Sequence, residues 1–256
     1  MEEQDLNLLK TKLQEIKETG WIKSQRLGNA GGVGNTLEDL LGIPENNLQL
    51  PDFGKWELKS QRAKTKSRLT LFHCEPQPRQ DGIVAQILLP QFGWPHRKAG
   101  ILYPEDEKSF RQTISAISYS DRGFIVKIDK DNKRIYASFD YEQIKERHFK
   151  WRDNLPTKTL NPVPYWTFND IAQKLDTKLH NLIYVKAETQ LISGKEYFHY
   201  TEIEAYTNPT LENFLNLVEN GSVYIDFDAR TSHNHGTKFR IKPSARNDLY
   251  QQHIII

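Results

Sequence analysis

Two carboxylates and a lysine in one short segment constrain this sequence more than any other feature. Asp52 is followed after four residues by Glu57, and Lys59 comes two residues later. A strand is predicted over 54–62, and residues i and i+2 of a strand project to the same face, so Glu57 and Lys59 should stand side by side. Asp52 joins them if the chain bends at Phe53-Gly54. Paired carboxylates suit Mg²⁺, and the lysine can position a water or neutralise charge on a phosphate.

The same spacing has an ordinary structural explanation. Asp, Glu and Lys are common residues, and the segment also fits an edge strand with a solvated Glu57–Lys59 face. The residues downstream favour a functional interpretation, because the chain has no acidic residue from 60 to 72 but a run of basic ones, which is a local footprint for a polyanion. This run consists of Arg62, Lys64, Lys66 and Arg68.

A third carboxylate is expected upstream, on a short helix over residues 35–42. Asn35 or Thr36 suits the N-cap position, and Gly42 suits the C-terminal stop. Glu38 would lie within this helix, ahead of the predicted strand. The alternative for Glu38 is a carboxylate on the surface of a helix with no part in chemistry.

A second informative segment, residues 222–241, is predicted to form two strands around a polar loop. It concentrates side chains that can read base edges in the major groove, where arginine pairs with guanine and aspartate with cytosine. Two alternatives stay open: an ordinary polar strand surface, and a metal site of His233, His235 and Asp228, which the neighbouring Arg and Lys side chains disfavour by repelling a cation. The candidate base-contacting residues are Asp228, Arg230, His233, His235, Lys238 and Arg240.

The sequence GNTLEDLLGIPENN followed by LPDFGKWELKSQR, within Gly28–Arg62, resembles the catalytic core of the MvaI/BcnI restriction endonucleases, and the C-terminal segment is similar to theirs as well. These enzymes are related to the mismatch-repair nicking enzyme MutH and have the PD-(D/E)xK nuclease fold. The resemblance implies a type II restriction endonuclease that cleaves double-stranded DNA with Mg²⁺ at a short pseudopalindromic site, CCWGG or CCSGG being the first candidates. It gives the catalytic positions to Glu38, Asp52, Glu57 and Lys59, with Asp52 and Glu57 as metal ligands. From the basic run, Arg62 and Lys64 are the expected DNA contacts.

Two other functions are compatible with parts of this sequence pattern. A MutH-like repair nickase would use the same catalytic residues, but the C-terminal segment matches the restriction enzymes more closely. A non-catalytic, sequence-specific DNA-binding protein is disfavoured because all four expected catalytic positions hold competent residue types.

The order of elements predicts an α/β protein, with a mixed central sheet and flanking helices in the PD-(D/E)xK core and a second α+β lobe for DNA recognition. Prolines at 155–164 set the expected boundary, which gives a catalytic lobe over 1–155 and a recognition lobe over 156–256, packed as one two-lobed unit. The apolar run at 83–89 predicts a buried central strand, and residues 141–151 predict a short helix.

The composition argues against several other classes of protein, including disulfide-bonded proteins, proteins with cysteine-based zinc sites and membrane proteins. The net charge of the 256-residue chain is only +2, so a DNA-binding surface has to come from local clusters of charge. The single Cys74 excludes an intramolecular disulfide and a cysteine-based zinc site. No apolar stretch approaches the length of a membrane span, and we expect a cytoplasmic monomer that binds DNA and no membrane. The resemblance also implies a cognate DNA methyltransferase in the same cell, without a stable complex.

Overall fold

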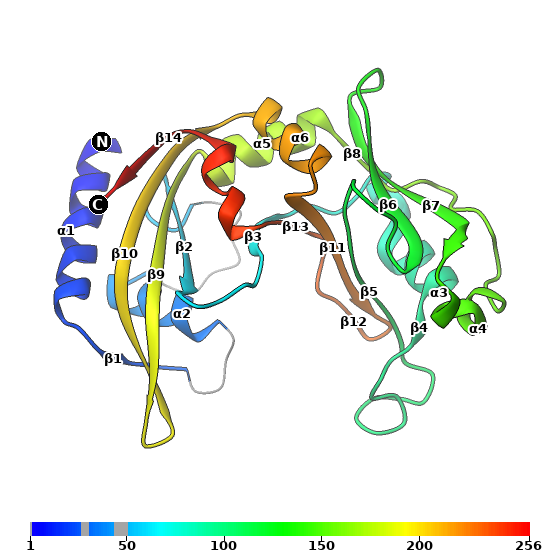
Figure 1. Cartoon of the computed structure of the whole chain (residues 1–256), viewed down its shortest axis with the longest axis horizontal. Helices are drawn as coiled ribbons and strands as arrows, with labels where there is room; N and C mark the ends of the chain where they lie inside the picture. The colour runs from blue at the N-terminus through cyan, green and yellow to red at the C-terminus, as the bar shows by residue number, and fades with distance from the viewer. Residues whose placement is uncertain (1, 27–30, 44–50) are drawn as a thin grey trace. The chain divides into compact units, whose positions relative to one another are not determined.

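The computed structural model describes residues 2–26, 31–43 and 51–256, so residues 28–30 and 44–50 of the predicted catalytic segment lie outside the described residues. The fold is mixed α/β with several sheets, and the chain divides into two compact units (Figure 1). The predicted single boundary at 155 differs from these units, because in each of them strands from the second half of the chain pair with strands from the first half. Unit 1 consists of Met1–Ser67, Gln173–Thr210 and Arg246–Ile256, and unit 2 consists of Arg68–Ala172 and Leu211–Ala245.

Unit 1 is organised around a five-stranded sheet with the order β1-β10-β9-β2, in which β14 also pairs with β10. β9 and β10 form an antiparallel hairpin whose Ser193-Gly194 turn has φ angles of 50° and 73°. β2 runs parallel to β9, with Leu58 opposite Ile183. The strands of this sheet are β1 (Ile22–Lys23), β2 (Trp56–Arg62), β9 (Asn181–Ile192), β10 (Lys195–Pro209) and β14 (Tyr250–Ile255).

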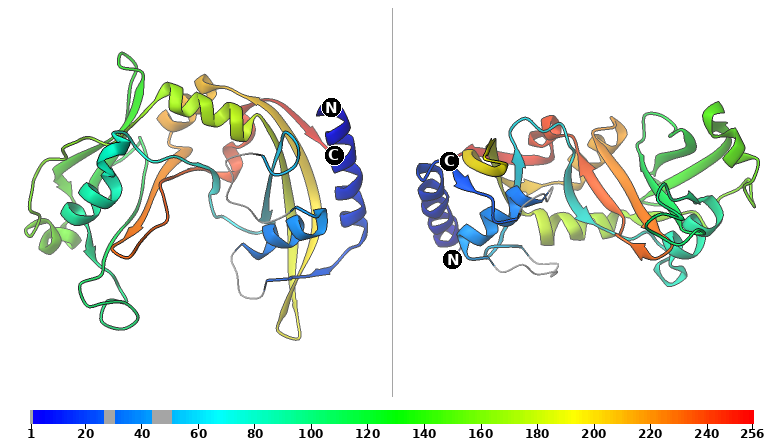
Figure 2. Two further views of the ribbon diagram at one scale, coloured as in Figure 1. Left: turned by 180° about the vertical axis from the view of Figure 1, so that it is seen from behind. Right: turned by 90° about the horizontal axis from the view of Figure 1, so that it is seen from below.

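Two helices, α1 (Glu2–Glu18) and α2 (Gly32–Leu41), supply apolar side chains to the core of unit 1. Leu13 of α1 and Leu37 of α2 are buried together with Leu58 of β2 and alternate residues of β9 and β10, so both helices cover the same face of the sheet. Figures 1 and 2 show α1 beside β10 and β14, which brings the two ends of the chain close together. This packing leaves the opposite face of β2 available for polar side chains.

The structure places the start of α2 earlier than predicted. Gly31 is its N-cap and Gly32 its first residue, so the prediction that Asn35 or Thr36 caps the helix is wrong. Thr36 is instead buried within the helix, where its hydroxyl accepts a backbone hydrogen bond of 3.3 Å. Close packing explains the glycine start, because a Cβ on Gly32 would lie 3.2 Å from a backbone carbonyl oxygen of the preceding loop. The helix ends as predicted at Gly42, which has a φ of 71°.

Unit 2 contains a six-stranded antiparallel sheet with the order β3-β13-β11-β5-β4, with β12 paired to β11, and a three-stranded sheet β6-β7-β8. The two strands predicted within residues 222–241 are confirmed as β11 and β13. The strands are β3 (Leu69–His73), β4 (Trp94–Pro95), β5 (Lys108–Ile114), β6 (Arg122–Asp129), β7 (Arg134–Ile144), β8 (Tyr165–Thr167), β11 (Val223–Arg230), β12 (His233–Asn234) and β13 (Lys238–Ile241).

The helix α5 (Phe168–Leu179) begins in unit 2 and ends in unit 1. A reciprocal capping box fixes its start: Asp170 N donates to Thr167 Oγ1 (3.0 Å), and Thr167 N donates to Asp170 Oδ2 (3.1 Å). Its last turn carries Lys178, directly before β9. The described chain also contains the helix α6 (Leu211–Glu219) and the 3₁₀ turns Arg79–Asp81, Pro243–Ala245 and Asn247–Leu249.

The prediction of a buried strand at 83–89 is wrong. Residues Val84–Leu88 form a π-helical turn, η2, which continues into α3 (Leu89–Phe92). Leu88 and Phe92 are fully buried in it. A short apolar run suits a buried helix as well as a buried strand, and the periodicity of the sequence does not separate the two.

The predicted helix at 141–151 is only partly helical. β7 extends to Ile144, where it still pairs with Arg122 of β6, and helical turns follow as η3 (Glu146–His148) and α4 (Phe149–Arg152). Pairing with β6 therefore overrides the local preference of residues 141–144, since tertiary contacts outweigh weak helix propensity.

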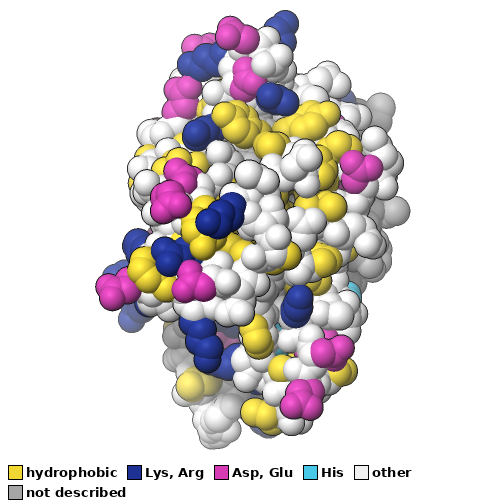
Figure 3. Space-filling model, turned by 90° about the vertical axis from the view of Figure 1, so that its right-hand side faces the viewer, with side chains coloured by type: hydrophobic (Ala, Val, Ile, Leu, Met, Phe, Trp, Pro, Cys, Tyr) yellow, Lys and Arg dark blue, Asp and Glu magenta, His cyan; other side chains and the backbone are white. Residues whose placement is uncertain are grey.

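None of the helices in the described ranges is both long and apolar enough to cross a membrane. Figure 3 shows one face of the molecule, on which basic and acidic side chains are interspersed with hydrophobic ones. This mixture agrees with the net charge of +2 and means that any polyanion site depends on local arrangement.

Candidate active site and polar face of β11

The two faces of β2 carry different chemistry. Trp56 and Leu58 belong to the core of unit 1, and Glu57 and Lys59, which alternate with them, project to the other face. There, Lys59 Nζ donates a hydrogen bond to Glu57 Oε1. The prediction that Glu57 and Lys59 stand side by side is therefore confirmed.

A tight bend brings Asp52 to the same end of β2. Phe53 and Trp56 exchange two backbone hydrogen bonds of 2.9 and 2.8 Å, and Gly54 within this turn has a φ of 57°, a conformation that favours glycine. Asp52 Oδ2 then accepts a hydrogen bond of 2.8 Å from Leu58 N. The expected bend is thus present, and it fixes one carboxylate against the backbone of the strand that carries the other.

Glu57 is the most unusual ionisable group of this site, because only 1% of its side chain is exposed. Lys59 contacts Oε1, and Lys178 Nζ lies 2.7 Å from Oε2. Burial raises the pKa of the Glu57 carboxyl above its ordinary value; Lys59 and Lys178 oppose this shift, and the nearby charge of Asp52 reinforces it. The strand therefore presents a buried carboxylate held between two ammonium groups.

Lys178 was not predicted from the sequence. It reaches Glu57 because α5 leads directly into β9, and β9 pairs in parallel with β2, so that Asn181 lies opposite Trp56 at the start of both strands. A basic residue in the last turn of a helix before a strand is too common to single out. Only the pairing of β2 with β9 identifies this lysine.

Glu38 lies half-buried on α2, on the core side of the sheet. A Cβ on Gly34 would lie 3.5 Å from Ser60 Oγ and 4.0 Å from Glu38 Oε1, which places this carboxylate near the middle of β2. Within the described ranges, no three Asp, Glu, His or Cys side chains form a group that could hold a metal ion. Glu38 therefore does not complete a three-carboxylate group with Asp52 and Glu57.

Arg62 and Lys64, the two predicted DNA contacts of the basic run, have different environments. Arg62, the last residue of β2, forms a bidentate ion pair with Glu196 through Nε–Oε1 (2.8 Å) and Nη2–Oε2 (2.9 Å), and this hydrogen-bonding raises its pKa. Lys64 is exposed in the turn that follows the strand. Arg62 thus contributes to the structure of unit 1, whereas Lys64 is accessible to a ligand.

The candidate DNA-contacting residues of unit 2 share one face of its larger sheet. Odd-numbered residues of β11 are buried, and the even-numbered residues project to the other side. The register brings Arg111 of β5 opposite Asp228, and Lys238 of β13 opposite Asp226. The face defined in this way, called here the β11 face, contains Arg111, Asp226, Asp228, Arg230, Lys238 and Arg240.

Charges on the β11 face are paired with one another. Asp228 binds Lys238 (2.8 Å) and Arg111 (2.6 Å), and Arg240 binds Asp226 (2.8 Å). Burial alone would raise the pKa of the Asp228 carboxyl, but the hydrogen bonds from Lys238 and Arg111 outweigh it and hold that pKa below its ordinary value. A ladder of ion pairs therefore runs across three strands.

Arg230 extends the same face towards the loop before β5. It forms an ion pair of 3.0 Å with Glu107, which is 2% exposed, and its guanidinium lies 4.4 Å from the ring centroid of Tyr103. Neither partner was predicted from the sequence, because Glu107 and Tyr103 come from a loop distant in sequence.

The two histidines of this segment are exposed and lie against each other, with ring centroids 4.2 Å apart. Asp228 is engaged by its two cations, and the described residues contain no three-ligand metal group. The alternative of a metal site formed by His233, His235 and Asp228 is therefore not borne out. Burial lowers the pKa of His235, so this imidazole favours its neutral form.

Comparisons of the sequence and of the structure with known proteins point to the same family. A profile of the MvaI/BcnI restriction endonuclease family matches residues 10–250. The solved structure of a restriction endonuclease MvaI–cognate DNA substrate complex is similar to this chain with a TM-score of 0.80 at 26% sequence identity, covering 98% of this chain and 97% of that one. The structure of MvaI in the absence of DNA has a TM-score of 0.54 at the same identity and coverage. No curated protein sequence gives a significant match.

The ion pairs of Asp228 generate a prediction about stability and pH. Because the folded-state pKa of Asp228 is lowered, its ionised form stabilises the protein above the ordinary aspartate pKa, and this contribution is lost as the pH falls through the lowered value. We expect Asp228→Asn to destabilise unit 2 by on the order of 1 kcal/mol at neutral pH and to have little effect in acid. Thermal unfolding across the pH range measures the difference. Asp131→Asn, in an exposed turn, is the control, and an equal loss at every pH would contradict the assignment.

Proposed function

The chain belongs to the MvaI/BcnI restriction endonuclease family, and on this basis we propose that it is a type II site-specific deoxyribonuclease. The proposed reaction is Mg²⁺-dependent hydrolysis of phosphodiester bonds in double-stranded DNA at a short pseudopalindromic sequence. CCWGG and CCSGG, which the resemblance implies, are the first sequences to test. The observation that carries the proposal is the convergence of Asp52, Glu57 and Lys59 at one end of β2.

The residues at this end of β2 fit a hard divalent cation. Asp52 and Glu57 supply carboxylate oxygens, the ligand type that Mg²⁺ prefers, and the charge of Asp52 raises the pKa of Glu57, which means that added positive charge would be favourable between them. Bound there, Mg²⁺ would supply Lewis-acid activation of water and charge neutralisation at the phosphate. Asp52 and Glu57 are therefore the proposed ligands.

Each residue of the site has a proposed role in hydrolysis. Asp52, anchored by the backbone of Leu58, holds its carboxylate in a fixed position while DNA enters. Lys59, half-buried beside Glu57, can orient the attacking water through its ammonium hydrogens and offset negative charge that develops on the phosphate. Burial of Glu57 keeps bulk water away and strengthens these charge interactions.

Two further groups are proposed to support the site from outside it. Lys178 is a positioning residue, since it holds the carboxylate of Glu57 without being part of the motif. Glu38 is proposed to act from α2, through an intervening water or by orienting other groups near β2. Together with β2 they would form the PD-(D/E)xK core of the enzyme.

The β11 face is the surface proposed to contact the base edges and so to recognise the DNA sequence. Arg230 and Arg240 present guanidinium groups that can bind guanine bidentately, Asp228 can accept from cytosine, and His233, His235 and Lys238 add donors nearby. Their present partners hold these side chains in defined positions before DNA arrives. Lys64, together with Arg62 if it exchanges Glu196 for phosphate, is proposed to contact the DNA backbone.

The proposal extends to the state of the protein in the cell. A single chain with one motif suits a monomer, which has to read the two halves of a pseudopalindrome with different residues. An enzyme with this activity acts in the cytoplasm, where its DNA substrate is, alongside a cognate methyltransferase that protects host sites without forming a stable complex with it.

The first test of the proposal concerns Lys59. Lys59→Ala should lower the rate of plasmid cleavage in Mg²⁺ about a hundred- to thousandfold, the usual cost of losing a group that stabilises transition-state charge. Specific binding measured in Ca²⁺ should stay within about twofold of the parent chain, because Lys59 is not a proposed reader of bases. Lys195→Ala, in the exposed β9–β10 hairpin, is the control. Cleavage by Lys59→Ala at the parent rate would refute the catalytic assignment.

The second test separates the positioning role of Lys178 from a purely structural one. Lys178→Ala removes one of two cations that lower the pKa of Glu57, so that pKa should rise and the pH of half-maximal cleavage should move upward. The rate at neutral pH should fall about tenfold, the usual cost of one charge-assisted contact. Lys178→Arg should restore most of the rate. A lower rate with an unchanged pH profile, and no rescue by arginine, would argue for a structural effect alone.

The third test concerns the β11 face. Arg230→Ala or Arg240→Ala should weaken binding to the cleaved sequence about ten- to a hundredfold, while binding to random duplex changes much less, since a bidentate guanine contact is worth about 1–3 kcal/mol. Binding is measured in Ca²⁺ on a duplex containing the sequence identified from the ends of cleaved plasmid. Arg134→Ala, an arginine of β7 paired with Asp129, controls for loss of an ion pair. Equal loss on both duplexes would assign these arginines to phosphate contacts.

A further inference from the structure

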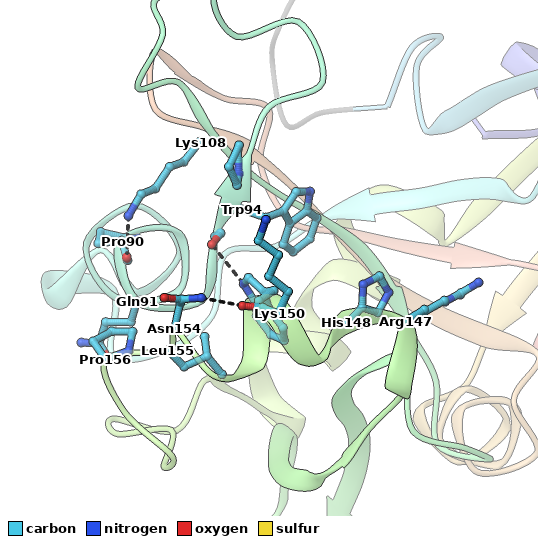
Figure 4. Close-up of a pocket in the computed structure, with 13 residues that line it drawn as sticks. Pro90, Gln91, Trp94, Lys108, Arg147, His148, Lys150, Asn154, Leu155 and Pro156 are labelled. Atoms are coloured by element: carbon cyan, nitrogen blue, oxygen red, sulfur yellow. Dashed lines mark hydrogen bonds between the residues drawn. The ribbon is translucent and has the colours of Figure 1, made fainter.

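Unit 2 contains a cavity of about 760 Å³ that the proposed nuclease chemistry does not use. One wall is formed by residues 90, 91 and 93–95, and another by residues 147, 148, 150, 151 and 154–156, which belong to α4 and the segments on either side of it. Lys108 of β5 completes the lining (Figure 4). None of the lining residues lies on β2 or β11. Its size falls within the range of small-molecule sites in proteins.

The ionisable side chains that line this cavity are all basic. They are Lys108, Arg147, His148 and Lys150, and no Asp or Glu is among the described residues of the lining. Arg147 has a partner outside the cavity, Asp121, and Lys108 Nζ donates to Pro90 O (3.2 Å). Lys150 is exposed and makes no ion pair within the described parts of the chain, and Figure 4 shows its side chain extending towards Trp94.

A further cation lies directly behind this lining. The guanidinium of Arg122 covers the ring of Trp94 at 3.7 Å from its centroid and lies 5.3 Å from that of Trp151. Its Nε is buried without a hydrogen-bond partner, and no carboxylate within the described ranges forms an ion pair with it. Burial lowers the pKa of His148, and the positive charges of Arg122 and Arg147 lower it further. Lys150 in the lining and Arg122 beside it thus bring positive charge to the cavity that no carboxylate of the described residues pairs with.

Aromatic surface accompanies this positive charge. Trp94 and Trp151 both line the cavity, with ring centroids 6.4 Å apart and planes at 86°, and Trp151 Nε1 donates to Gly93 O (3.2 Å), which fixes the second ring. A fixed indole can stack on a flat heterocycle, a contact worth about 1–3 kcal/mol per base in single-stranded DNA complexes. Rigid aromatic groups beside cations are complementary to a ligand that is both aromatic and anionic.

We propose that this cavity binds a nucleoside monophosphate, with the base against Trp94 and Trp151 and the phosphate at Lys150 and Arg147. The ligand can come from two sources with the same chemistry: a free nucleotide, or the 5′-phosphorylated end of a single DNA strand. The site is independent of the catalytic role proposed for β2.

Calorimetric titration of the full chain with dAMP tests the proposal. We expect saturable binding with a Kd below about 1 mM, and deoxyadenosine and inorganic phosphate should each bind at least about tenfold more weakly, because each lacks one half of the recognised group. Lys150→Ala should weaken dAMP binding about tenfold and Lys150→Glu more than that. Lys127→Ala, an exposed lysine of β6 away from the cavity, should leave binding unchanged. Quenching of tryptophan fluorescence provides a second readout, since two of the five tryptophans of the chain, Trp94 and Trp151, line the site.

A 5′-phosphorylated trinucleotide distinguishes the two sources of ligand. If it binds more tightly than dAMP and loses affinity in Lys150→Ala, the natural occupant is a strand end; equal or weaker binding identifies a free nucleotide. No saturable binding of dAMP, equal affinity for inorganic phosphate, or an equal loss in Lys127→Ala would overturn the proposal. The same titration on Lys59→Ala, which is expected to lose cleavage, should give the parent affinity, so failure of the nuclease assignment and failure of this site are separate results.

Discussion

Burial of the Glu57 carboxylate is the interaction on which the site of unit 1 depends. Removing an ionised carboxylate from water costs several kcal/mol unless opposite charge and hydrogen bonds replace the lost hydration. Lys59 and Lys178 provide that charge, one from the same strand and one from the end of α5. The second contact exists only because β9 lies beside β2, so the longest hairpin of the unit and the chemistry of its edge strand are parts of one arrangement.

Local features of the site could be predicted from the sequence, and its long-range partners could not. The alternation along β2 and the bend before it follow from residue type, which is why Glu57, Lys59 and Asp52 are found together as expected. Lys178 depends on a strand pairing across more than a hundred residues, for which one sequence carries no evidence. The prediction of a strand at 83–89 was wrong for a different reason. A short apolar run has no periodicity that distinguishes a helical turn from a strand.

The pairing of charges on the β11 face bears on how such a face would distinguish DNA sequences. Four cations (Arg111, Arg230, Lys238, Arg240) meet three carboxylates (Glu107, Asp226, Asp228), so the set carries a net charge of about +1 and adds little general attraction for phosphate. A base pair with the correct donors and acceptors can take over these hydrogen bonds, whereas an incorrect one leaves a desolvated charge without a partner. Selectivity would then come from the cost of a mismatch rather than from overall affinity.

The interleaving of the two units also has a consequence for synthesis of the protein. The chain passes between the units four times, since five sequence segments alternate between them. β2 leaves the ribosome early, but its partner β9 and the lysine at the end of α5 follow more than a hundred residues later, and β14, which completes the sheet, comes after every other strand. A nascent chain that already carries the whole Asp52–Lys59 motif therefore lacks the scaffold that buries Glu57, and the timing of translation itself delays assembly of the site.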